Sequence, residues 1–350
     1  MTTAVGPLSE TAGEPDVPRA LRSRPSVADQ VYARITTGAG VTVLAIMLVI
    51  GGFLSARALE AIVAAGWSFF TTAAWQPEGG EFGIAAILTG TVLIGLTAIV
   101  IAVPLAFGTA LYISEYAPTR IRRFLINLVD LMAAVPSVVY GLWGFFLLQP
   151  QLLVVGPQGE GIPRWLATWM SWIPLFQVQA GGVPVDPRDP ATTGTVFTSS
   201  IFIAGVVVAL MVAPITCSIM RESFSQAPLS EREGAYALGA TRWGMIRSVV
   251  LPFGAGGMIG GTMLGLGRAL GETIAVYMVI SIAFDVKIRI LENGGSSVSA
   301  LIALRFGEAS EFGTSALMAA GLALFLLTLV VNFGASAVIA RSRSGAVSDA

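Results

Sequence analysis

The sequence predicts an all-α membrane protein with six transmembrane helices and both termini in the cytoplasm. Hydrophobic residues make up 55% of the chain and charged residues only 12%, whereas about a quarter of the residues of a soluble protein are charged. Six apolar runs each exceed the roughly 18 residues that indicate a membrane-spanning helix. Most arginines flank alternate connections between these runs, and the positive-inside rule places those connections in the cytoplasm.

The six apolar runs set the domain organisation. They cover about residues 35–56, 84–112, 124–148, 196–220, 252–284 and 312–340. We expect residues 1–32 to form a mobile cytoplasmic tail, because they are polar and lack periodic apolar positions. Residues 33–83 should hold the first helix and an aromatic-rich connector at the extracytoplasmic membrane interface. Residues 84–340 form the core, with an extracytoplasmic loop at 149–195 and a cytoplasmic loop at 221–251, before a cytoplasmic tail at 341–350.

The third apolar run contains Pro136, followed by Ser137 and two glycines. This pattern predicts a broken or kinked helix, which a membrane tolerates where neighbouring helices satisfy the freed backbone groups. The Ser137 hydroxyl could line a solute path, although serine in a membrane helix more often bonds a neighbouring helix.

The composition excludes several classes of function. The chain has no histidine, which removes histidine-based zinc, haem and Ser/His/Asp sites. Its one cysteine, Cys217, lies in an apolar run and is interpreted as a buried small side chain. Its one lysine, Lys287, follows no glycine-rich loop, so a Walker A site is absent and any ATP would have to bind another polypeptide. We expect no cofactor on this chain, and its sparse charges leave no surface for nucleic acid.

The polar loop at 221–251 is predicted to form two short helices. Ser230 and Glu233 have the spacing of a capping box, which predicts a helix from Glu231 to about Leu238. Gly239 suits the left-handed position that ends a helix. Thr241 can then cap a second helix that leads into the fifth apolar run.

Charge inside the membrane occurs in the fifth run, at Arg268 and Glu272. Residues four apart share a helical face, so we expect this pair within salt-bridge distance, at the end of a groove formed by Gly257, Gly261 and Gly265. Three roles stay open: Arg268 meets a translocating anion, the pair forms a gate, or the pair is a structural bridge. Charged groups at this depth are costly and commonly functional. Thr273, beside Glu272, is a weaker candidate for the path.

Three stretches of the sequence resemble a known family. The first is E-G-A at Glu233–Ala235 with Gly239 and V-V-L-P at 249–252, which resembles the EAA loop of ABC importer permeases, with Gly234 and Val249 as mild departures. The others are GGTMLGLGRALGETIAV at 260–276 and AAVPSVVYGLWG at 133–144. Together they resemble the PstC-type permeases of phosphate-specific ABC importers, over about residues 85–340.

The resemblance implies a type I ABC importer permease fold in the bacterial plasma membrane. It implies that Glu233, Ala235 and Gly239 lie at or near a contact with an ATPase subunit. The implied partners are a second, PstA-like permease, two PstB-like ATPase subunits and an extracytoplasmic PstS-like phosphate-binding protein. ATP hydrolysis would then belong to a partner, and this chain would not be an enzyme.

Two alternatives to a phosphate permease remain. The same machine could carry another oxyanion, such as sulfate or molybdate. An ion-driven secondary transporter is a different class, which predicts an inverted repeat and leaves the loop at 221–251 unexplained.

Overall fold

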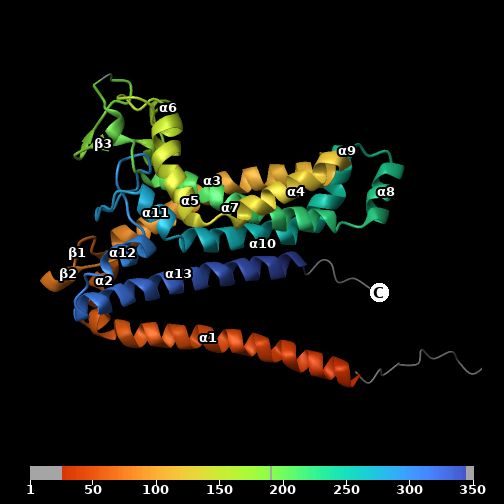
Figure 1. The fold of residues 1–350 in the computed structure, drawn as a ribbon, viewed down its shortest axis with the longest axis horizontal. Helices are drawn as coiled ribbons and strands as arrows, with labels where there is room; N and C mark the ends of the chain where they lie inside the picture. The colour runs from red at the N-terminus through yellow and green to blue at the C-terminus, as the bar shows by residue number, and fades with distance from the viewer. Residues whose placement is uncertain (1–25, 190, 344–350) are drawn as a thin grey trace, which may run out of the picture. The chain divides into compact units, whose positions relative to one another are not determined.

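The computed structural model describes residues 26–189 and 191–343, and these residues are predominantly helical (Figure 1). Five helices in this part of the chain are long and apolar enough to cross a membrane. They are α1 (Val27–Ala65), α3 (Ala85–Leu111, extended by a π-helical turn at Tyr112–Tyr116), α7 (Ile201–Ser225), the continuous helix Arg242–Leu270, and α13 (Glu311–Arg343). A bent pair of helices brings the number to six if it counts as one span, which confirms the predicted helical membrane fold.

The bent pair is the third predicted span. Helix α4 (Thr119–Ala134) ends at Val135, and α5 (Ser137–Trp143) continues as a π-helix to Leu153 after a turn of 90°. Val135 is extended, with ψ of 129°, because a residue before proline is excluded from the helical region. The predicted break at Pro136 is therefore present. Helix α5 then packs against α11 (Ile274–Val279): a Cβ at Gly141 would lie 2.9 Å from Ala275 Cα.

Small residues bring the central helices together. Helix α7 lies against α3 and α10 (Leu251–Leu270), and a Cβ at Gly205 of α7 would lie only 2.6 Å from Thr97 Cγ2. The predicted glycine face of α10 exists, but α7 covers it: Cβ atoms at Gly257 and Gly265 would meet Ser223 at 2.2 Å and Thr216 at 2.7 Å. This face is a close helix–helix contact, as small residues in membranes favour, and not an open groove.

The fifth span differs from its predicted limits at both ends. It begins at Arg242, with α9 (Arg242–Met245) and a π-helical turn at Ile246–Val250, and passes Pro252 without a break. It ends at Leu270, and the short helix α11 follows after Gly271. The predicted continuation to residue 284 is wrong, because α11 ends at Val279, Ile280 is extended, and no helix follows before α12.

The end of the molecule opposite α8 (Leu229–Ala237) carries the long connections (Figure 1). Here lie two hairpins, 3-10 turns and short helices, which are α2 (Ser68–Thr71), β1 (Trp75–Gln76), Pro77–Gly79, β2 (Glu81–Phe82), α6 (Ile162–Trp169), Pro174–Phe176, β3 (Gln179–Ala180), β4 (Val183–Pro184), Gly194–Val196 and α12 (Val298–Arg305). Glu292 accepts from the Gln179 amide at 2.8 Å and from Arg289, which ties the connection at 149–195 to the one before α12.

The chain divides into two compact units between Ile50 and Gly51, so the boundary falls within helix α1. This helix begins at Val27, so residues 27–32 of the predicted tail are helical, whereas residues 1–25 lie outside the described part. Within the second unit, the end of α1 packs on α13, where Ser315 Oγ donates to the Arg57 carbonyl at 2.8 Å. Helix α13 includes Arg341 and Arg343 of the predicted C-terminal tail, and residues 344–350 are not described.

Candidate functional site

The loop at 221–251 forms the predicted helix–turn–helix, with a different start. Helix α8 begins at Leu229, one residue after Pro228, so Ser230 lies inside the first turn and accepts no capping hydrogen bond. The predicted capping box is therefore wrong, because proline with its fixed φ already starts the helix. The predicted end is right: Gly239 is left-handed, with φ of +83°, and its amide donates to the Tyr236 carbonyl at 2.9 Å.

The second helix of this loop begins as predicted. Thr241 Oγ1 accepts from the Gly244 amide at 3.1 Å. The turn between the two helices is closed by the Ala240 amide, which donates to the Ala235 carbonyl at 3.0 Å. The loop is thus a defined turn, held by its own backbone.

The outer surface of this loop is apolar at several positions. Leu238 is 91% exposed, and Leu229, Tyr236 and Trp243 are also exposed. Of the three residues predicted at an ATPase contact, Glu233 and Gly239 are exposed, and Ala235 is half-buried against the protein's own core. Exposed large apolar side chains around a rigid turn are typical of a protein–protein contact surface.

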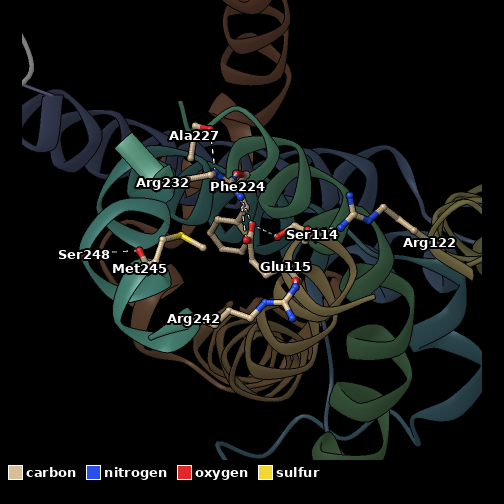
Figure 2. A network of polar contacts seen from close by, with 9 residues as sticks. All are labelled: Ser114, Glu115, Arg122, Phe224, Ala227, Arg232, Arg242, Met245 and Ser248. Carbon is tan, nitrogen blue, oxygen red and sulfur yellow. Dashed lines mark hydrogen bonds and ion pairs between the residues drawn. The ribbon is translucent and has the colours of Figure 1, made fainter. Parts of the chain in front are cut away.

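A buried ion pair anchors α8 to the membrane helices (Figure 2). Arg232 Nη1 donates to both carboxylate oxygens of Glu115, at 3.0 and 2.9 Å. The other nitrogens of Arg232 donate to the carbonyls of Phe224 at 2.6 Å and Ala227 at 3.1 Å. Glu115 is only 5% exposed. One arginine therefore joins α8 to the end of the second span and the end of α7.

Two more arginines surround the same point (Figure 2). Arg242, at the start of the fifth span, donates to the Glu115 carbonyl and lies 4.8 Å from the ring centroid of Tyr116. Arg122, on α4, donates to the Ser114 carbonyl at 2.8 Å. Ser114 and Glu115 lie at the C-terminal end of the helix that finishes at Tyr116, where the last carbonyls have no helical partner. The network joins four membrane segments to α8.

Neither Arg232 nor Glu115 is predicted from the sequence as a candidate site residue. Their local signals are weak: an acid at the end of an apolar run, and an arginine in a polar loop. They are 117 positions apart in the chain, so no spacing rule could pair them.

The structure separates the pair predicted at Arg268 and Glu272. Helix α10 ends at Leu270, so the two residues do not share a helical face, and the described residues show no ion pair between them. Glu272 is buried, and its Oε1 accepts from the Ala275 amide at 3.3 Å, where α11 begins. The predicted salt bridge is therefore wrong, because the glycine at position 271 ends the helix between the two charges.

Arg268 lies in the last turn of α10 and is exposed, as is Leu264 one turn earlier. Within the described residues it has no hydrogen bond or ion pair. Charged side chains within membrane-spanning segments usually pair with another group or face a water-filled cavity. The described part of the chain provides no such partner for Arg268.

The two weaker candidates lie on elements in contact. Ser137 is the first residue of α5, and Thr273 immediately precedes α11, which packs against α5. Both are half-buried, and Thr273 Oγ1 donates to the Gly271 carbonyl at 3.3 Å. Among the described residues, no group of three or more Cys, Asp or Glu side chains is placed to hold a metal ion.

Comparison with known proteins identifies the family. Residues 102–344 match the family model described as "Binding-protein-dependent transport system inner membrane component". The chain belongs to this family. It is a multi-pass inner membrane component of a transport system, and not an enzyme.

Within this family, the chain is similar to PstC permeases. It is 40% identical over 314 residues to the phosphate transport system permease protein PstC 2 of Mycobacterium tuberculosis, covering 89% of this chain and 91% of that protein. It is 41% identical over 290 residues to PstC of Mycobacterium leprae, covering 82% and 85%. The resemblance to PstC-type permeases inferred from the motifs is confirmed.

A solved structure supports the fold alone. A chain of a bacterial ABC transporter for the acidic polysaccharide alginate superposes with a TM-score of 0.50 at 16% identity, covering 89% of this chain and 99% of that chain. The type I importer permease fold is thereby confirmed.

The Arg232–Glu115 pair generates a prediction for this permease. Arg232→Gln leaves the buried Glu115 carboxylate without its counter-ion, a change that costs about 3–5 kcal/mol. The amides of residues 229–237 should then exchange with solvent at least about 100-fold faster, since each 1.4 kcal/mol is a factor of ten. Hydrogen exchange with mass spectrometry measures this.

The double variant Arg232→Gln/Glu115→Gln should recover part of the protection, because no unpaired charge remains. Arg247→Gln is the matched control, since Arg247 is exposed and makes no hydrogen bond or ion pair within the described residues. Equal exchange in the Arg232 and Arg247 variants would show that the ion pair does not hold α8.

Proposed function

We propose that this chain is the permease subunit of an ATP-driven importer of inorganic phosphate. The observation that carries the proposal is the match of nearly the whole chain, at 40% identity, to a protein named as a phosphate transport permease. The sequence has no Walker A site, so the energy for import must come from another subunit. The partners are those that the PstC resemblance implies: a PstA-like permease, two PstB-like ATPase subunits and a PstS-like binding protein.

In this proposal the end of the molecule that carries α8 faces the cytoplasm and receives the ATPase. The excess of arginine at 120–123 and 221–247 supports this orientation. The exposed turn at Gly239, with Leu238 beside it, supplies the docking surface. Glu233 lies on that surface, and Ala235 holds the turn against the core.

Arg268 is proposed to line the phosphate path or its gate. Its exposure and its lack of a partner within the described residues support a position at the contact with the second permease. The planar guanidinium donates two parallel hydrogen bonds to a phosphate oxyanion. Glu272 then starts α11 and fixes the backbone after Arg268, while Ser137 and Thr273 lie on the elements that would border the path.

The first test is reconstitution of the complete transporter in liposomes. Phosphate uptake should require ATP, the ATPase subunits and the binding protein, and this chain alone should give no uptake under an ion gradient. Sulfate and molybdate in excess should leave uptake unchanged. Uptake by the isolated chain under an ion gradient would identify a secondary transporter. Competition by sulfate or molybdate would show that the transporter carries that oxyanion.

Arg268→Ala should reduce uptake at least about 100-fold, the usual loss when one charge-stabilising donor is removed from an oxyanion site. The chain should still fold and co-purify with the other subunits, because Arg268 makes no hydrogen bond or ion pair within the described residues. Arg268→Lys should retain an intermediate rate, since it keeps the charge without the planar fork. Arg123→Ala, at an exposed arginine of α4, is the control. Normal phosphate uptake by the Arg268→Ala variant would show that Arg268 belongs to neither the path nor the gate.

Gly239→Val should weaken ATPase binding and uncouple hydrolysis from uptake. A β-branched residue in the left-handed region costs about 1–2 kcal/mol, while the absence of atoms within 4 Å of its Cβ position excludes a steric clash as the cause. Gly239→Asn should be milder, because asparagine tolerates this conformation. Gly256→Ala, in open space on α10, is the control. If the Gly239→Val variant keeps full coupling between hydrolysis and uptake, the ATPase docks on another surface.

A further inference from the structure

A small basic pocket lies beside the anchor of α8. It has a volume of about 140 Å³ and is bounded by Arg122 of α4, Arg221 of α7 and Arg232 of α8, together with Ser114 and Ser225. Three different helices therefore contribute one arginine each. A cavity needs only about 10–15 Å³ to hold one water, so this pocket accommodates a polyatomic ion.

The three arginines of the pocket differ in how many of their N–H groups already donate hydrogen bonds. Arg232 is committed to Glu115 and to two carbonyls. Arg122 uses one N–H on the Ser114 carbonyl and keeps its other donors. Arg221 makes no hydrogen bond within the described residues, and its one ion pair there, to Glu222, is long at 4.0 Å and involves a side chain that is 59% exposed. The lining includes no acidic side chain.

This arrangement has the chemistry of an oxyanion site. Two guanidinium groups with free N–H donors converge on one space, and guanidinium forks match the spacing of phosphate oxygens. Positive charges that are held close together repel one another, and an anion between them relieves that repulsion. Arg221 is only partly exposed, so solvent screens it less than a surface charge.

We propose that this pocket binds one tetrahedral phosphate oxyanion and thereby holds α8 against α4 and α7. The same chemistry is present in free inorganic phosphate and in a phospholipid headgroup. A bound anion would link arginines from three helices, so by mass action it would stabilise the docked position of α8. The effect on transport rests on the proposed function, but the binding does not.

The pocket is distinct from the proposed phosphate path. Arg242 marks the pocket end of the fifth span through its bond to the Glu115 carbonyl, and Arg268 lies near the other end of that span. At 1.5 Å per residue, the helix separates the two by roughly 40 Å. Loss of binding in the pocket is therefore separable from loss of binding at Arg268.

The test places a reporter thiol in the pocket of the full transporter complex. Cys217→Ala removes the one native cysteine, and Ser225→Cys introduces a thiol at an exposed lining position. The rate of its reaction with N-ethylmaleimide is measured in phosphatidylcholine vesicles. Inorganic phosphate at ten times its dissociation constant should slow the reaction about tenfold, relative to chloride at equal ionic strength.

Controls separate the pocket from general charge effects. A Ser230→Cys reporter, outside the pocket on the same loop, should not respond to phosphate. Arg221→Gln should abolish the protection at the Ser225→Cys reporter, and Arg247→Gln should preserve it. Hydrogen exchange of α8 should slow with phosphate in the native chain and not in Arg221→Gln.

The vesicle composition distinguishes the two sources of the anion. If a lipid headgroup is the ligand, phosphatidylglycerol vesicles should protect the reporter before phosphate is added, and Arg221→Gln should remove that protection. Protection by neither phosphate nor phosphatidylglycerol would overturn the proposal, as would equal protection in Arg221→Gln. The measurement does not depend on uptake, so a failure here leaves the proposed function standing.

Discussion

The buried ion pair between Arg232 and Glu115 is the constraint on which the arrangement of the α8 end depends. Arg232 donates to Glu115 at the end of the second span and to the carbonyls of Phe224 and Ala227 at the end of α7, and so fixes α8 to both. Charges in such a position give little net stability, because desolvation offsets their attraction. The pair instead restricts the position of α8, because few alternative positions would satisfy both the arginine and the carboxylate. A force applied to α8 therefore reaches the ends of the second span and α7 directly.

The fifth span extends that connection across the membrane. Arg242 contacts Glu115 at one end, and Arg268 projects from the last turn at the other end. Between them, glycines of the helix lie directly against α7: a Cβ at Gly254 would meet the Phe224 ring at 2.5 Å, and one at Gly265 would meet Thr216 at 2.7 Å. Small residues of this kind favour a close helix–helix contact in a membrane. The fold thus couples the α8 end to the neighbourhood of Arg268 through one continuous helix.

Local sequence patterns predict the structure correctly where its cause is local. Gly239 and Thr241 determine the turn by their own conformations and hydrogen bonds, and Pro136 breaks its helix by excluding Val135 from the helical region. The capping box failed because Pro228, two residues before Ser230, started the helix first. The Arg268–Glu272 pair failed because a helical face was assumed to continue past Gly271. The Arg232–Glu115 pair was not predictable at all, since only the tertiary fold brings residues 117 positions apart together.

Arg232 and Arg268 differ in the same way. Arg232 pairs with Glu115, whereas Arg268 has no hydrogen bond or ion pair among the described residues. In water the difference would be minor, but in a membrane an exposed arginine beside an exposed leucine needs a counter-charge, a hydrogen-bond acceptor or water. At the other end of the span, the exposed Leu238 in the turn also lacks a partner. Here the unsatisfied surface is apolar and not charged. Two unsatisfied surfaces of opposite character, joined by one helix, are what a subunit needs if one partner supplies energy and another completes the path.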